Sequence, residues 1–175
     1  NGKVRPYHLD FVLKEMNMSQ HKIVNYINQI ENKNPNLNVV SACTDITGFG
    51  LLGHLTEMLE HTNIYQLKMN SKPLKIILEL DKVPVYDGVL DLVGKGFQSS
   101  FAPSNDIFLK NIYGKKNLSI ELIYDNFNFN SVLYNNMLKV LLDPQTCGPL
   151  VITCSSIHSD ILIQNGPWKK IGFIT

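Results

Sequence analysis

Apolar residues recur every three or four positions in three segments of the chain, which is the spacing of one face of an α-helix. The segments are residues 20–30, 51–59 and 131–142. Their apolar faces consist of Ile23, Tyr26, Ile27 and Ile30, then Leu51, Leu52, Leu55, Met58 and Leu59, then Leu133, Met137, Leu138 and Leu141. Ser19 stands where the first of these helices needs an N-cap. The spacing therefore predicts three amphipathic helices.

Short runs of β-branched and other apolar residues lie between these helices and predict strands. The predicted strands cover residues 37–43, 64–69, 74–80, 119–124, 150–154 and 171–174. Shorter helices are predicted over residues 86–93, 105–113 and 155–164. Because strands and helices are interleaved, we expect an α+β domain in which helices cover a layered, mixed sheet.

Length and composition fit one compact domain. The chain has 175 residues, of which 44% are hydrophobic and 18% charged. A formal net charge of +1 with scattered Lys and Arg argues against nucleic-acid binding, and no apolar run approaches the roughly 20 residues of a membrane span. Residues 1–18 are expected to form an arm or the remnant of an upstream domain, and residues 19–175 the domain itself. The absence of an initial Met suggests a fragment.

The three cysteines do not form a recognisable metal or disulfide pattern. Cys43, Cys147 and Cys154 are odd in number and far apart in the sequence, without a C-x-x-C pair. Free thiols are typical of a cytosolic protein, so we expect a cytoplasmic location.

The segment from residue 43 to residue 54, CTDITGFGLLGH, combines features that suit phosphate chemistry. A predicted strand ends near Asp45, and a helix starts after Gly48, where unpaired N–H groups and the positive end of the helix dipole favour an anion. Glycines at 48 and 50 allow a ligand to approach the backbone closely, and a carboxylate is a suitable ligand for Mg²⁺. The predicted site residues are Thr44, Thr47, Gly48 and Gly50 for the nucleotide and Asp45 for magnesium.

This segment also fits three other interpretations. It could be a purely structural strand–turn–helix corner, with Thr47 as the cap and His54 as a packing or surface residue. Residues 48–53 also match G-x-G-x-x-G, but the acid that a dinucleotide-binding unit needs about 20 residues later is missing near Asn70. A kinase glycine loop is disfavoured because no catalytic-loop or D-F-G sequence is present.

Two ordered motifs resemble those of selenophosphate synthetases. Residues 44–54 are similar to the family signature T-D-[VI]-T-G-F-G-[LI]-L-G-H, and residues 142–150, LDPQTCGPL, are similar to its D-P-Q-T-S-G-G-L segment. The chain departs from the second motif at Cys147 and Pro149, and the proline removes an N–H donor. The resemblance covers most of residues 19–175 and implies the carboxyl-terminal domain of the aminoimidazole ribonucleotide synthetase superfamily.

This resemblance implies a function for a longer protein. The family makes selenophosphate, AMP and phosphate from selenide, ATP and water, with Mg²⁺ ions that Asp45 would help to hold. The implied partner is an amino-terminal domain missing from this chain, which carries the reactive Cys or selenocysteine, a Lys and further acids, and the full-length protein is expected to be a homodimer. No residue of this chain is then catalytic, and the chain alone is expected to be inactive. Two alternatives stay open: a related ATP-dependent synthetase with another substrate, or a non-catalytic interaction module.

Overall fold

The computed structural model describes residues 4–33, 38–113, 119–125 and 130–175. Its helices are α1 (Pro6–Met16), α2 (His21–Lys33), α3 (Gly50–Lys68), α4 (Val89–Gly94), α5 (Ala102–Tyr113), α6 (Ser131–Leu142) and α7 (Ser156–Asn165), with a 3₁₀ turn η1 at Leu80–Lys82. Its strands are β1 (Ala42–Asp45), β2 (Ile76–Glu79), β3 (Ile120–Ile123), β4 (Leu150–Thr153) and β5 (Gly172–Ile174).

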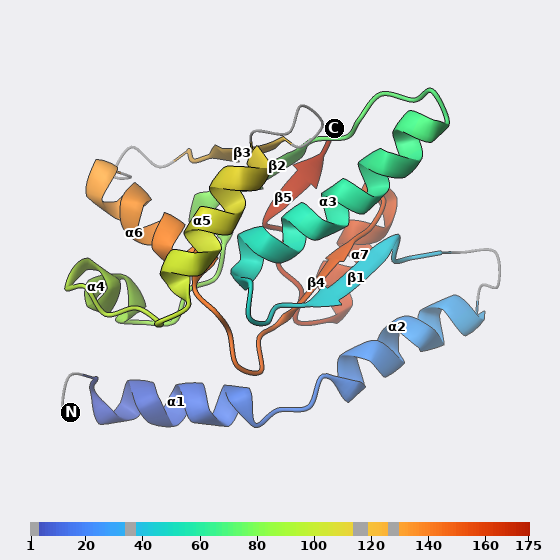
Figure 1. The fold of residues 1–175 in the computed structure, drawn as a ribbon. Helices are drawn as coiled ribbons and strands as arrows, with labels where there is room; N and C mark the ends of the chain where they lie inside the picture. The colour runs from blue at the N-terminus through green and yellow to red at the C-terminus, as the bar shows by residue number, and fades with distance from the viewer. Residues whose placement is uncertain (1–3, 34–37, 114–118, 126–129) are drawn as a thin grey trace.

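The strands form two small sheets (Figure 1). In the larger sheet β2 lies in the centre, parallel to β3 and antiparallel to β5. In the smaller sheet β1 pairs antiparallel with β4, so that Asp45 lies opposite Leu150. The described residues thus contain helices and a mixed sheet, and the predicted α+β class is confirmed.

The main core lies where α3 and α6 pack against the larger sheet. Leu78 of β2, Leu80 directly after β2 and Leu141 of α6 are each only 1% exposed. Ile46 and Val151 extend this core to the β1–β4 pair, so the chain reversal after β1 is fixed from its buried side. A second, smaller cluster joins α2, α7 and the outer side of β4 through residues that include Ile27, Val39 and Leu162.

Most predicted elements occur close to their expected positions, and α6 has the predicted bounds. The strand predicted at 64–69 is wrong, because α3 continues to Lys68. The weak alternation of residues 64–69 does not reflect a strand. The buried face of α3 carries Leu59 and Asn63, while Ile64 and Tyr65 are exposed. The Asn63 side chain also accepts the Leu74 N–H through Oδ1 at 2.6 Å and donates from Nδ2 to the Leu74 carbonyl at 2.9 Å.

Two predicted elements start at least three residues later than expected. The strand predicted from residue 37 begins at Ala42, because the N–H groups of Val39 and Val40 donate to the Glu31 carboxylate at 3.0 and 3.3 Å instead of to a neighbouring strand. The helix predicted from residue 86 begins at Val89 because Gly88 has φ +82°, a left-handed conformation that does not continue a helix.

The predicted arm contains helix α1. None of the residues of α1, all of which the structure describes, is buried. The helix contacts the loop before α4, where the rings of Phe11 and Tyr86 meet edge to face with centroids 5.9 Å apart. The division between residues 1–18 and residues 19–175 stays a prediction.

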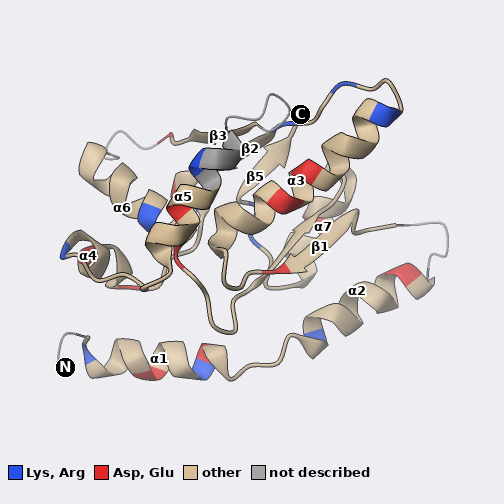
Figure 2. Ribbon diagram, viewed as in Figure 1, with Lys and Arg blue, Asp and Glu red and all other residues tan. Residues whose placement is uncertain are grey.

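Charged residues are dispersed over the elements. Figure 2 shows both signs of charge on α1, α2, α3 and α5. None of the described helices has the length and apolar character that crossing a bilayer would need.

Candidate functional site

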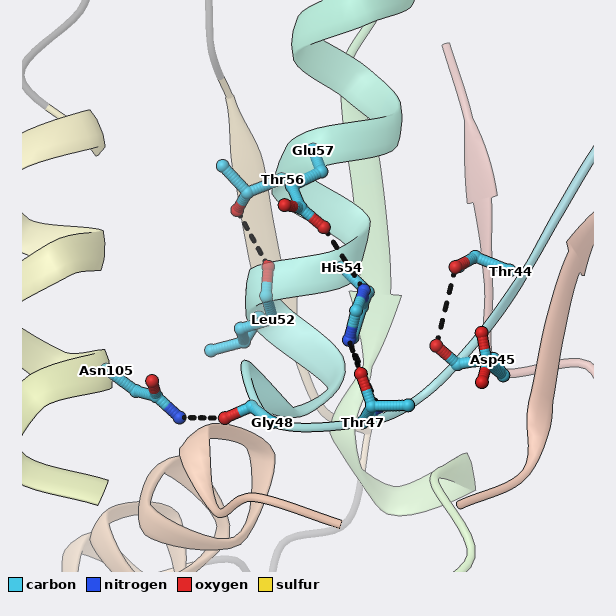
Figure 3. Close-up of polar contacts among 9 residues, drawn as sticks. All are labelled: Thr44, Asp45, Thr47, Gly48, Leu52, His54, Thr56, Glu57 and Asn105. Atoms are coloured by element: carbon cyan, nitrogen blue, oxygen red, sulfur yellow. Dashed lines mark hydrogen bonds and ion pairs between the residues drawn. The ribbon is translucent and has the colours of Figure 1, made fainter. Parts of the chain in front are cut away.

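Strand β1 presents Asp45 at its carboxyl end, directly before the chain reverses into α3 (Figure 3). Side chains alternate along a strand, so Thr44 faces the core side, opposite Val151, whereas Cys43 and Asp45 share the other face. The Asp45 side chain is exposed, and within the described ranges no hydrogen bond to its carboxylate is found. Its oxygens are therefore available to a cation.

The reversal after Asp45 is held by the second motif. The Ile46 N–H donates to the Pro149 carbonyl at 3.0 Å, and the Gln145 N–H donates to the Thr47 carbonyl at 3.0 Å. Gly148 lies so close that a Cβ atom there would be 2.0 Å from the Ile46 carbonyl oxygen. The two motifs, about ninety residues apart in the sequence, thus form one backbone junction.

His54 fixes the position of Thr47. Its Nε2 lies 3.0 Å from both the backbone nitrogen and the Oγ1 of Thr47, and its Nδ1 lies 3.1 Å from the Glu57 carboxylate. Because the Thr47 N–H donates to Nε2, Nε2 is the acceptor nitrogen, and Nδ1 carries the proton that is donated to Glu57. His54 is only 8% exposed, so it is a packed residue that supports the turn.

The two glycines of the turn differ in their surroundings. Gly50 is buried, with φ +67°, and a Cβ there would lie 2.7 Å from the Leu141 carbonyl oxygen. It therefore allows the start of α3 to pack against the last turn of α6, and its predicted nucleotide contact stays a prediction. Gly48 is exposed and has nothing within 4 Å of the Cβ position, so the backbone is open to a ligand there.

Helix α5 also contacts the turn, which the sequence did not indicate. The Asn105 Nδ2 donates to the carbonyls of Gly48 and Leu142 at 2.9 and 2.8 Å. The rings of Phe49 and Phe108 stack with centroids 5.7 Å apart, and both remain partly exposed. The sequence could not indicate these contacts, because residues 98–130 match neither motif and the residues in contact lie far apart in the sequence.

The departures in the second motif do not disturb this junction. The Pro149 carbonyl accepts the Ile46 N–H, so the bond between the motifs at this position does not need an N–H on residue 149. Cys147 is exposed and has φ +54°, a backbone conformation that residues other than glycine rarely adopt. Asp143 accepts the Ser99 N–H at 3.0 Å. The segment forms the turn between α6 and β4.

Asp45 suits a shared metal site better than a site of its own. Among the described residues no group of three or more His, Cys, Asp or Glu side chains is placed to hold a metal ion. Mg²⁺ prefers six oxygen ligands and usually keeps waters and substrate phosphates among them. One exposed carboxylate at a fixed turn fits one position of such a shell, and the remaining ligands must come from elsewhere.

We predict that the charge of Asp45 affects the neighbouring thiol. Burial and, to a smaller extent, the Asp45 carboxylate raise the pKa of Cys43. Asp45→Asn should lower this pKa, enlarge the thiolate fraction at pH 8 and speed alkylation of Cys43 about twofold, the modest size expected for partly screened charges. Mass spectrometry of iodoacetamide-treated protein measures each cysteine separately.

Cys154 is the internal control for this experiment, because burial alone raises its pKa. Its alkylation rate should be the same in both proteins. Equal rates at Cys43 would show that the Asp45 carboxylate does not face the thiol.

Comparisons with known proteins agree with the motifs. Residues 12–92 match the family model of the AIR synthase related protein, C-terminal domain. The chain is 28% identical over 163 residues to a selenide, water dikinase of Haemophilus influenzae, which covers 93% of this chain and 37% of that protein. It is 33% identical over 124 residues to the selenide, water dikinase of Geobacter metallireducens, a match that covers 71% of this chain and 29% of that protein. It is 30% identical over 148 residues to the selenide, water dikinase of Treponema denticola, a match that covers 78% of this chain and 34% of that protein. The chain spans about a third of the length of these relatives.

Proposed function

Because this chain carries an AIR synthase related C-terminal domain and is a relative of selenide, water dikinases over most of its length, we propose that it is the part of such an enzyme that covers the ATP and magnesium site. The reaction would convert selenide, ATP and water into selenophosphate, AMP and phosphate. Asp45 would supply one ligand to magnesium, and Thr47 and Gly48 would lie beside the phosphates. The nucleotide contact of Thr44, which lies on the other face of β1 from Asp45, stays a prediction.

The observation that carries this proposal is the exposed Asp45 carboxylate at a turn fixed by both motifs. A carboxylate buried and bonded to protein donors would have been unable to reach a cation. Bound magnesium would screen the charge of the triphosphate, so that an anionic nucleophile can reach phosphorus. The role of this chain is to hold a carboxylate and an open backbone segment in a fixed arrangement before the substrate binds.

The partner proposed is an amino-terminal domain of the same protein, whose acids would complete the metal site and whose reactive residue would act on selenide. The length of the relatives, about three times that of the matched region, supports this proposal. Residues 1–18 would be an arm or the remnant of that upstream domain, and residues 19–175 would form the covering domain. We further propose that the complete enzyme is a cytoplasmic homodimer.

The test is the product formed by the full-length protein from ATP and Mg²⁺, with and without selenide, followed by ³¹P NMR. We expect AMP, phosphate and selenophosphate to form only when selenide is present. ATP turnover that requires a different nucleophile would instead identify a related synthetase. Absence of ATP turnover, together with no effect of nucleotide or Mg²⁺ on the thermal unfolding temperature, would identify a non-catalytic module.

A further inference from the structure

Asn105 joins three elements at the turn after β1. Its Nδ2 donates to the Gly48 carbonyl in the turn and to the Leu142 carbonyl at the last residue of α6. From this geometry we infer that Asn105 is a positioning residue, which holds the Gly48 segment where the proposed nucleotide site needs it. The inference rests on the proposed function for the site itself.

The chemistry of the carboxamide explains why asparagine suits this place. Both acceptors are carbonyl oxygens, so only the NH₂ end of the side chain can face them, and its two hydrogens serve one carbonyl each. Leu142 belongs to the last turn of α6, whose carbonyls have no partner within the helix. At 6% exposure Asn105 is shielded from water, so neither carbonyl would easily regain a partner after its removal.

Gly48 depends on this contact more than its neighbours do. Thr47 is held by His54 and by Gln145, and Gly50 is packed against α6. Around the Cβ position of Gly48, by contrast, the described residues leave 4 Å of open space. Packing therefore does not fix this segment, and the bond from Asn105 sets the direction of its carbonyl.

Phe108 gives α5 a second contact with the same turn. It lies three residues after Asn105, on the same side of the helix, and its ring stacks on Phe49. The helix thus contacts the backbone of one turn residue and the side chain of the next. Substitutions in α5 should change the turn without touching a ligand.

The experiment compares Asn105→Ala with Asn63→Ala. Asn63 is a matched control because it is also a buried asparagine of a helix that hydrogen-bonds backbone groups, but its partner is Leu74. In this chain, amide hydrogen exchange of residues 47–50 should become about tenfold faster in Asn105→Ala, while Asn63→Ala should speed exchange near Leu74 and leave residues 47–50 unchanged.

In the full-length protein, Asn105→Ala should raise the Mg²⁺ concentration that gives the half-maximal rate about tenfold. A small displacement of the Gly48 segment would misplace the nucleotide and the Mg²⁺ bound with it. Asn63→Ala should leave this concentration unchanged. Should Asn105→Ala fail to fold, Phe108→Leu at a partly exposed position should give a smaller change in the same two measurements.

The outcomes separate the two proposals. Equal exchange at residues 47–50 in the Asn105→Ala and wild-type chains would overturn the positioning role, whatever the enzyme does. Faster exchange there in both asparagine variants would also overturn it, since the effect would then be general loss of stability. Absence of selenide-dependent activity in the wild-type protein would refute the proposed function, while the exchange data would still decide the role of Asn105.

Discussion

Asp45→Asn is expected to lower the rate of selenide-dependent AMP formation by the full-length protein about a hundredfold. The carboxamide keeps the shape of the side chain but loses the negative charge that a hard divalent cation requires. Removal of one preorganised electrostatic contact typically costs a rate factor of this order. The half-maximal Mg²⁺ concentration should rise as well, because the metal itself is held less well.

The same substitution should leave folding unaffected. Asp45 is exposed, and changes at such positions usually alter the free energy of unfolding by less than about 0.5 kcal/mol. Asp91→Asn provides the matched control, because Asp91 is an exposed aspartate on α4, away from the turn. An Asp45→Asn enzyme as fast as the Asp91→Asn enzyme at limiting Mg²⁺ would refute the metal role.

Gly148→Ala is expected to lower the free energy of unfolding by about 3 kcal/mol, the upper end for overpacking a tight site. The added methyl would lie 2.0 Å from the Ile46 carbonyl oxygen and 2.9 Å from the Gln145 Cβ. The first of these is backbone, so relief requires the two motifs to separate. The bond from the Ile46 N–H to the Pro149 carbonyl would be strained by the same movement.

Urea unfolding of this chain, followed by circular dichroism, measures the effect. Gly48→Ala is the control, because the Cβ would enter open space and Gly48 does not have a positive φ. It should change stability by well under 1 kcal/mol. Similar midpoints for the two variants would show that the junction between the motifs is looser than described.

The parts of the fold that depend on local pattern could be predicted from the sequence. The apolar spacing of residues 131–142 gave the bounds of α6, and the spacing at 51–59 located α3. The strand predicted at 64–69 was wrong because a short, weakly alternating run does not distinguish a strand from the exposed side of a long helix.

The candidate site was predictable only in part. The sequence located Asp45 at the end of a strand and a helix start after Gly48, and the structure agrees, since β1 ends at Asp45 and α3 begins at Gly50. It could not indicate that Gly148 touches Ile46 or that Asn105 reaches Gly48, because these contacts depend on how distant segments pack. The reason for a glycine at position 50 could not be predicted either, because it lies in the close approach of the α6 backbone.

The metal role of Asp45 is tested most directly by a crystal structure of the full-length protein with a non-hydrolysable ATP analogue and Mn²⁺ in place of Mg²⁺. Anomalous scattering would locate the metal ions independently of the protein density. We expect a manganese ion bound to an Asp45 oxygen, near the roughly 2.1 Å typical of Mg²⁺–oxygen bonds, and shared with the nucleotide phosphates. Nucleotide and metal bound with Asp45 outside coordination distance would refute the proposed metal role of Asp45.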